Sequence, residues 1–344
     1  MTAEARRRPR PRTVVLTTVV TLAAVAAAVL IGPASLDPMG VLAELLDRLP
    51  LVEIDSGLSS REAAIVWELR LPRAVLGALV GATLAAAGAA YQGVFRNPLA
   101  DPYLLGVAAG AGLGATLAIV TVGSGSVLVP AAAFVGAVAA VTVTYALGAA
   151  GGGRRTGTTL ILAGVAVAAF LTAAQTFVQQ RNADTIREVY AWILGRLGTT
   201  GWGDVALMAP YAFISIAVIW LHRRLLDVLA VGEDEALTLG VSPDRVRTAV
   251  VVAATLGTAG AVAVGGLIGF VGIVVPHTIR LLAGSSYRSI IPLTIIGGAA
   301  FLTIADLVAR TALSPSEIPI GVVTAFVGGP FFVVVLRNAR RGAS

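Results

Sequence analysis

The stretch AVLGALVGATLAAAGAAYQGVFRNPLADPYLLGVAAGAGLGATLAIVTV (Ala74–Val122) consists of two long apolar runs joined by a short polar segment, FRNPLADPYLLG (Phe95–Gly106). Each apolar run is continuous and about 20 residues long, the length that a helix needs to cross the ~30 Å hydrocarbon core of a bilayer. A membrane β-barrel would instead show short segments of alternating polar and apolar residues. The stretch therefore predicts two membrane-spanning helices separated by a tight turn.

The polar segment has the residues of a turn between helices. Asn97-Pro98 and Asp101-Pro102 hold the residue before each proline in an extended conformation, which ends one helix before the next begins. Asp101 is expected to cap the second helix, with Pro102 at the first helical position. We interpret the cluster as turn chemistry and not as a binding site.

The composition of the whole chain agrees with a membrane protein. The chain is 57% hydrophobic and 13% charged, with a mean hydropathy of +0.88, whereas a soluble protein carries about 25% charged residues. Cysteine is absent, which excludes disulfides, thiolate metal sites and thiol nucleophiles. Lysine is also absent, which excludes a P-loop ATPase because that motif requires its lysine. The predicted class is an all-α, polytopic membrane protein.

Dividing the whole chain at its charged or proline-rich breaks gives nine apolar segments, including the two described above. They cover residues 13–32, 74–95, 103–122, 127–150, 158–179, 205–221, 248–279, 290–309 and 318–336. The first could pass for a signal peptide, but Val14 to Ile31 is longer than the about 7–15 residues of such an apolar region, so we predict a retained span. Segment 248–279 would form a helix of about 48 Å, too long for a bilayer. Because it is rich in glycine, we predict two spans joined by a tight reversal, hence about ten transmembrane helices in one domain, 1–344.

The arginines predict the orientation. The net charge of +6 could suggest a nucleic-acid partner, but the arginines flank apolar runs, so no such partner is predicted. If the N-terminus lies inside, 17 of the 25 basic residues fall on inner segments, so both termini are predicted to be cytoplasmic. Residues 1–12 then form a cytoplasmic tail, and 36–73 form an extracytoplasmic loop with a short amphipathic helix in DPMGVLAELLDRLP. Residues 222–247 form a long, charged cytoplasmic loop, which either docks a soluble partner or is simply solvated.

Side chains that could perform chemistry are scarce. His222 and His277 stand alone, so no catalytic residue, metal site or cofactor is predicted. Asp306 and Arg310 lie four residues apart on one helix face and can pair, which leaves a structural and a transport role open. So few acids within the spans disfavour a carrier driven by protons or sodium. The energy for any transport would then arrive from another subunit, through the long inner loop.

Several motifs resemble one family. They are RLPRAVLGALVGATLAAAGAAYQGVFRNPLADPYLLGVAAGAGLGA (70–115), LILAGVAV (160–167), LAVGEDEALTLGV (229–241), GLIGFVGIVVPHTIRLL (266–282), ADLVAR (305–310) and EIPIGVVTAFVGGPFF (317–332). Together they resemble the FecCD-type permeases of ATP-binding-cassette importers for ferric siderophores, haem and vitamin B12. The likeness spans nearly the whole chain in order, and RNPLADP together with GFVG…PHxxR is specific.

This resemblance implies a fold, partners and a function. It implies ten spans with both termini inside, in a multi-pass protein of the cytoplasmic membrane. The implied partners are a second permease subunit, identical or different, two ATPase subunits that bind the ATP, and an extracytoplasmic substrate-binding protein. The chain itself would not be an enzyme. The expected substrate is an iron chelate, a ferric siderophore or haem; vitamin B12 is the alternative, and an ion-coupled secondary carrier is less favoured.

The resemblance also implies site residues. Docking of the binding protein maps to Arg70, Arg73 and Arg310, with anchoring at the membrane interface or pairing with Asp306 as the structural alternatives. Coupling to the ATPase maps to Leu229, Gly232, Glu233, Asp234, Glu235, Leu239, Gly240 and Val241, although the acidic run Glu233–Glu235 departs from some relatives. The inner gate maps to Thr156, Gly157 and Thr158, and the pathway to Thr172 and Gln175.

Overall fold

The computed structural model describes residues 11–48, 54–150, 157–198 and 201–341. Within these ranges all regular structure is helical, which confirms the predicted fold class. Seven of the described helices are long and apolar enough to cross a membrane, and three further apolar helices are shorter. Together these helices confirm the prediction of about ten membrane helices.

Ten helices correspond to the nine predicted apolar segments, because segment 248–279 forms two of them. They are α1 (Pro11–Leu30), α4 (Leu71–Val94), α5 (Val107–Val122), α6 (Leu128–Ala150), α7 (Gly157–Arg181), α9 (Trp202–Val231), α11 (Pro243–Gly265), α12 (Val271–Ala283), α13 (Tyr287–Thr311) and α14 (Ile320–Arg341). Shorter pieces join them: α2 (Pro38–Asp47), α3 (Ser60–Ala64), the π-helix η2 (Ile65–Arg70), the 3-10 turn η3 (Ala183–Thr185), α8 (Ile186–Ile193) and α10 (Glu233–Thr238).

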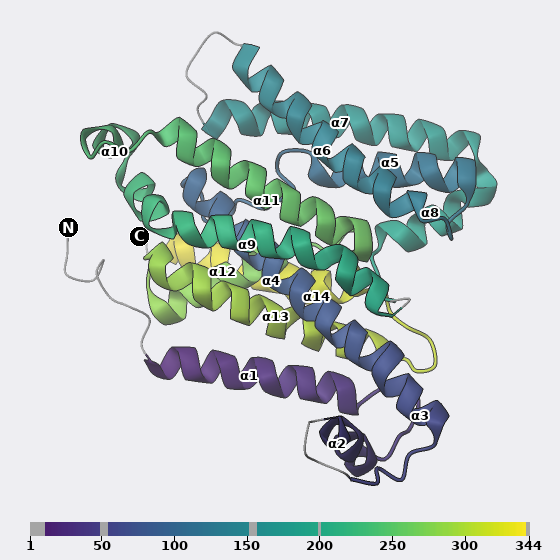
Figure 1. The fold of residues 1–344 in the computed structure, drawn as a ribbon. Helices are drawn as coiled ribbons and strands as arrows, with labels where there is room; N and C mark the ends of the chain where they lie inside the picture. The colour runs from purple at the N-terminus through teal and green to yellow at the C-terminus, as the bar shows by residue number, and fades with distance from the viewer. Residues whose placement is uncertain (1–10, 49–53, 151–156, 199–200, 342–344) are drawn as a thin grey trace.

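The long helices pack in layers around α4 (Figure 1). Helices α5, α6 and α7 form one layer, α4, α9 and α11 lie beside it, α12, α13 and α14 follow, and α1 covers α13 at the edge. The beginning of α1 and the end of α14 lie at the end of the bundle that carries α10, and α2 and α3 lie at the opposite end. We call these the α10 end and the α3 end.

Glycine allows the layers to approach closely. A Cβ atom at Gly81 of α4 would lie 2.2 Å from the carbonyl oxygen of Gly298 in α13, and one at Gly110 of α5 would lie 2.2 Å from that of Gly136 in α6. No side chain fits in either place, so the helix backbones are in direct contact. Such contacts hold helices together where lipid gives no hydrophobic drive for association.

Two predicted loops are shorter than expected. The helix that contains α4 begins at Ser60, where Ser59 and Glu62 form a capping box, and it continues through η2. Residues 60–73 of the predicted extracytoplasmic loop are therefore helical. Likewise α9 continues to Val231, so residues 222–231 of the predicted inner loop extend that helix. The linking segment is only 232–242, and it contains the short helix α10 between Gly232 and Gly240.

The prediction that Asp101 caps the helix after the turn is wrong. Helix α5 begins at Val107, and the residue at its N-cap is Gly106, with a left-handed φ of 87°. The Asp101 carboxylate accepts a hydrogen bond from the backbone N–H of Tyr103 at 2.8 Å and caps a turn instead. The prolines end α4 as expected, but the apolar residues after them enter the bundle as a buried turn, in which Leu105 is fully buried.

The glycine-rich segment breaks as predicted. Helix α11 ends at Gly265, residues 266–270 are not helical, and α12 has only 13 residues. At 1.5 Å per residue α12 is about 20 Å long, which is shorter than a bilayer core. Phe270, at the N-cap of α12, has a left-handed φ of 68°, which is costly for a residue with a side chain. The break therefore places a strained, non-helical segment inside the bundle.

Candidate functional site

The predicted pathway residues Thr172 and Gln175 lie on the wall of one cavity, which we call the α7 cavity. Its volume is about 430 Å³ and it is bounded by α7, α8, the first turn of α5 and Leu267. The polar side chains that line it are Tyr103, Thr172, Gln175, Thr176, Gln179 and Tyr190. None of its lining residues is a charged type, so the cavity offers amide and hydroxyl groups only.

A second cavity, the α14 cavity, lies next to the first. Its volume is about 470 Å³, and it is lined by apolar residues of α14 together with Ile193, Leu194 and Leu267. Ile193 and Leu267 line both cavities, so these two side chains form the divide between them. Leu267 belongs to the non-helical segment between α11 and α12. A broken helix thus contributes the boundary between the two hollows.

A third cavity, the α10 cavity, lies at the α10 end and has a volume of about 510 Å³. Thr158 of the predicted gate lines it together with Phe95, Arg96 and the coupling residues Gly232 to Glu235. The structure therefore brings predicted gate and coupling residues to one place. Of the other gate residues, Gly157 begins α7 and Thr156 lies outside the described residues.

Arg247 holds α10 in position. This arginine of α11 is buried, and its guanidinium donates to the carboxylates of Glu233 on α10 and of Asp244, the latter at 2.9 Å. Helix α10 buries Ala236 and exposes Leu237, and Leu239, directly after the helix, is exposed as well. Sequence reasoning missed Arg247, although its position three residues after Asp244 is a spacing at which helix side chains can pair.

The remaining predicted coupling residues surround α10. Leu229 is buried at the end of α9, and Val241 is half-buried just before α11. Gly232 precedes α10, and Gly240 follows it with a left-handed φ of 75°. Asp234 and Glu235 lie in the first turn of α10, where negative charge stabilises a helix. The segment is thus a short helix bounded by two glycines.

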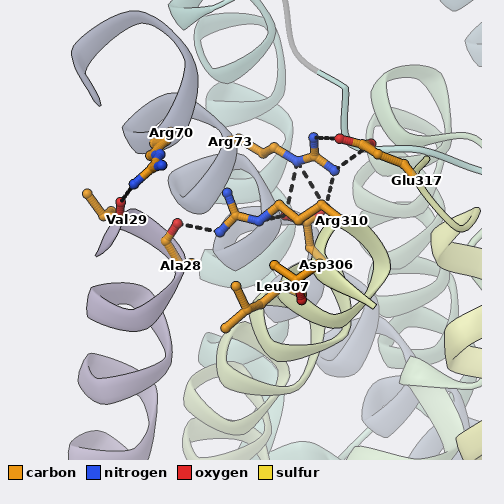
Figure 2. A network of polar contacts seen from close by, with 9 residues as sticks. Ala28, Val29, Arg70, Arg73, Asp306, Leu307, Arg310 and Glu317 are labelled. Atoms are coloured by element: carbon orange, nitrogen blue, oxygen red, sulfur yellow. Dashed lines mark hydrogen bonds and ion pairs between the residues drawn. The ribbon is translucent and has the colours of Figure 1, made fainter. Parts of the chain in front are cut away.

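At the α3 end, Arg70 caps the end of α1 (Figure 2). Its guanidinium donates to the carbonyl oxygens of Val29 at 3.0 Å and Leu30 at 2.8 Å, and also to that of Ala34. The last carbonyls of a helix have no partner within the helix, so a cation there both bonds them and complements the helix dipole. Arg70 is only 4% exposed.

Arg73 and Arg310 share the carboxylate of Asp306 (Figure 2). Arg73 donates to Asp306 from Nε and from Nη2, the latter at 2.8 Å, and also to Glu317, from Nη1 at 2.8 Å and from Nη2 at 3.0 Å. Nε of Arg310 lies 3.7 Å from Asp306, and Nη2 of Arg310 donates to the carbonyl oxygen of Ala28. The predicted Asp306–Arg310 pair is present, but the stronger partner of Asp306 is Arg73.

These contacts decide how much of each arginine a partner could reach. Arg70 and Arg310 are 4% and 3% exposed, whereas the Arg73 side chain is 14% exposed and that of Glu317 is 41% exposed. Sequence reasoning assigned no role to Glu317, although it begins one of the quoted motifs. Hydrogen bonds from Arg73 lower the pKa of the Glu317 carboxyl, so it stays ionised beside the arginine.

The comparisons with known proteins agree on one family. A model of the FecCD transport family matches residues 19–338. The cobalamin import system permease protein BtuC of Halobacterium salinarum is 42% identical over 82% of this chain and 76% of its own. The Fe(3+)-citrate import system permease protein YfmD of Bacillus subtilis is 36% identical over 86% and 87%, and the hemin transport system permease protein HmuU of Yersinia pestis is 36% identical over 81% and 85%. A solved structure of a metal-chelate type ABC transporter in an inward-facing conformation has a TM-score of 0.82 and 26% identity, covering 96% of this chain and 100% of its own.

Replacing Asp306 should destabilise the protein more than replacing an exposed acid. In Asp306→Asn, the buried Arg310 and the largely buried Arg73 lose their shared carboxylate, and removing one partner of a buried pair costs about 3 kcal/mol or more. The exposed Asp184→Asn, in the 3-10 turn η3 that follows α7, is the matched control. Unfolding of both variants in detergent checks this; equal stabilities would show that Glu317 alone satisfies Arg73.

Proposed function

Since the chain belongs to the FecCD transport family, and is therefore a permease subunit of an ATP-binding-cassette importer whose ATP is hydrolysed by separate subunits, we propose that it carries a large, neutral metal chelate inward across the cytoplasmic membrane. A second permease subunit faces it, so that each contributes one wall of the route. Two ATPase subunits bind at the α10 end, and a substrate-binding protein delivers the chelate at the α3 end.

The observation that carries this proposal is the uncharged wall of the α7 cavity. Amide and hydroxyl groups can exchange hydrogen bonds with a passing chelate without binding it tightly. An anionic chelate would have to leave water with no cation on this wall to replace its hydration, which is costly at low dielectric. The wall therefore favours a substrate whose rim carries neutral amides, as vitamin B12 does, over ferric citrate or haem, which carry carboxylates.

The relatives are compatible with this choice. The cobalamin permease named above is 42% identical to this chain, while the Fe(3+)-citrate and hemin permeases are each 36% identical. The family resemblance in the sequence favoured an iron chelate, with vitamin B12 as the alternative. On the uncharged lining we place vitamin B12 first and a neutral ferric siderophore second.

An uptake assay tests the substrate. The permease is reconstituted in liposomes with its ATPase and binding-protein partners, and import of labelled cyanocobalamin is compared with that of a neutral hydroxamate ferric siderophore and of ferric citrate. We expect ATP-dependent uptake of cyanocobalamin that excess ferric citrate does not reduce. Uptake of ferric citrate at a comparable rate would contradict the neutral wall. Uptake that survives without ATP but collapses with an uncoupler would instead indicate a secondary carrier.

Arrangement and charge support the orientation and the coupling role. The α10 end carries the start of α1 and the end of α14, and the arginine count along the sequence favours placing both of these helix ends in the cytoplasm. There the exposed Leu237 and Leu239 give α10 an apolar face that can enter a cleft on the ATPase. The ion pair between Arg247 and Glu233 fixes the angle at which α10 is presented.

Loss of Arg247 should loosen this contact. Arg247→Gln leaves Glu233 without its partner and frees α10, so the affinity of the permease for the ATPase subunits should fall about tenfold or more. Arg245→Gln, two residues away on an exposed position, is the matched control. Titration of purified ATPase against permease in nanodiscs measures both affinities; equal binding by the two variants would remove Arg247 from the coupling role.

The docking role of the outer arginines can be tested through Glu317. If a carboxylate of the binding protein engages Arg73, then Glu317 competes with it for the same guanidinium. Glu317→Gln should therefore tighten docking by about two- to fivefold, the scale of one exposed ion pair. The exposed Glu188→Gln serves as the control for lost negative charge at this face. Weaker docking by Glu317→Gln would mean that Glu317 itself contacts the partner. No change would leave Arg73 outside the interface.

A further inference from the structure

The turn Phe95–Gly106 reaches from the α10 cavity to the α7 cavity. Its first residues, Phe95 and Arg96, line the α10 cavity beside the coupling residues. Its last residues, Tyr103 and Gly106, line the α7 cavity beside the pathway residues. One stretch of 12 residues thus touches both the region that faces the ATPase and the wall that faces the substrate.

The turn is braced by its own hydrogen bonds. Backbone bonds join Asn97 to Gln92 at 3.1 Å, Ala100 to Asn97 at 3.0 Å and Leu104 to Asp101 at 3.1 Å. The side chains of Asn97 and Asp101 each accept from a backbone N–H two residues ahead, at 3.0 Å and 2.8 Å. Two prolines fix φ in the same stretch. These bonds and the two prolines stiffen the turn, so we expect it to move as a unit.

Tyr103 fastens the turn to the broken helix. The backbone N–H of Ile268 donates to the Tyr103 hydroxyl at 3.2 Å, and this hydroxyl donates to the carbonyl oxygen of Ile268 at 3.1 Å. One side chain thus satisfies both backbone polar groups of a residue that lies outside any helix. Pro102 packs against Gly272 on the other side of the break, where a Cβ atom would lie 2.6 Å from the proline ring.

The segment that Tyr103 holds separates the two cavities of the wall. Leu267, directly before Ile268, lines both the α7 cavity and the α14 cavity. Phe270, two residues after Ile268, has a left-handed backbone and packs on Gly328 of α14. A strained, non-helical segment between two hollows can rearrange at lower cost than a packed helix.

We propose that Tyr103 is a positioning residue for transport. Its hydroxyl carries movement of the turn Phe95–Gly106, driven from the α10 end, to segment 266–270. The resulting movement of this segment displaces Leu267 and opens the divide between the α7 and α14 cavities. The inference rests on the proposed function, because the movement at the α10 end is that of the ATPase-bound coupling segment. It adds a defined second end to that coupling. Such transmission requires an element with two arrangements that both ends can bias, and segment 266–270 is that element.

The natural absence of cysteine allows a direct test. Leu267→Cys is the single thiol of the permease, and its labelling by a water-soluble maleimide is measured in the complete complex, without nucleotide and trapped with ATP and vanadate. We expect the labelling rate to differ about fivefold or more between the two states. In Tyr103→Phe with Leu267→Cys, the two rates should become equal and uptake should fall, while ATP hydrolysis by the complex continues.

Tyr211→Phe with Leu267→Cys is the matched control, because it removes a hydroxyl from a half-buried tyrosine of α9 that lines none of the three cavities. It should keep both the state-dependent labelling and the uptake of the parent. Equal labelling of the parent in both states would overturn the proposal, and so would a Tyr103→Phe complex that keeps the difference. If Tyr103→Phe does not assemble with the ATPase, hydrogen exchange on the permease alone decides. The Ile268 amide should then exchange about tenfold faster than in the parent. Unchanged exchange would show that the Tyr103 hydroxyl does not hold Ile268, which would overturn the proposal.

These outcomes are independent of the wider functional assignment. A parent complex that hydrolyses ATP but imports no chelate would contradict the proposed function whatever the labelling shows. A parent complex that imports normally, and whose Tyr103→Phe variant does so equally well, would contradict only the role of Tyr103.

Discussion

Backbone hydrogen bonding is the constraint on which the rest of this structure depends. A bilayer offers no water to an N–H or C=O group, so every interruption of a membrane helix needs a partner from within the protein. At three helix ends in this structure, a side chain from another part of the chain supplies hydrogen bonds to the backbone. Arg70 bonds the end of α1, Tyr103 bonds the break before α12, and Gln92 of α4 donates to the carbonyl oxygen of Gly272 in the first turn of α12.

The same constraint explains what the sequence could predict. Apolar runs of spanning length predict continuous helices, and the ten that were expected are present. The break within 248–279 was predictable because that run is too long for the bilayer and rich in glycine. The partner of the break was not, since Tyr103 lies 165 residues from Ile268 in the sequence and nothing in a local pattern connects them. The extensions of α4 back to Ser60 and of α9 to Val231 were missed because their charged residues suit a loop and an exposed helix end equally well.

The candidate sites divide in the same way. The family resemblance predicts Thr172 and Gln175 on the pathway and Gly232 to Gly240 in a coupling segment. In the structure Thr172 and Gln175 line the α7 cavity, and Gly232 to Glu235 line the α10 cavity. The sequence did not reveal that two of the three predicted docking arginines, Arg70 and Arg310, are buried. Whether an arginine faces solvent or a helix end depends on the carbonyls and carboxylates that the fold brings near it. Glu317 and Arg247 were missed for that reason, since each gains its meaning from a partner on another element.

The capping of α1 has a consequence for the order in which the protein is made. Helix α1 is synthesised before the residues that bond its end, and its final carbonyls wait for Arg70, 40 residues later than Leu30. The carbonyl of Ala28 waits for Arg310, 282 residues later. During synthesis the carbonyls at the end of α1 can bond only to the hydrated lipid headgroups. Their permanent partners are synthesised later, Arg70 with η2 and Arg310 with α13. Helix α1 thus enters the membrane well before it is fixed in place, so a truncated product that ends before α13 would carry an incompletely anchored α1.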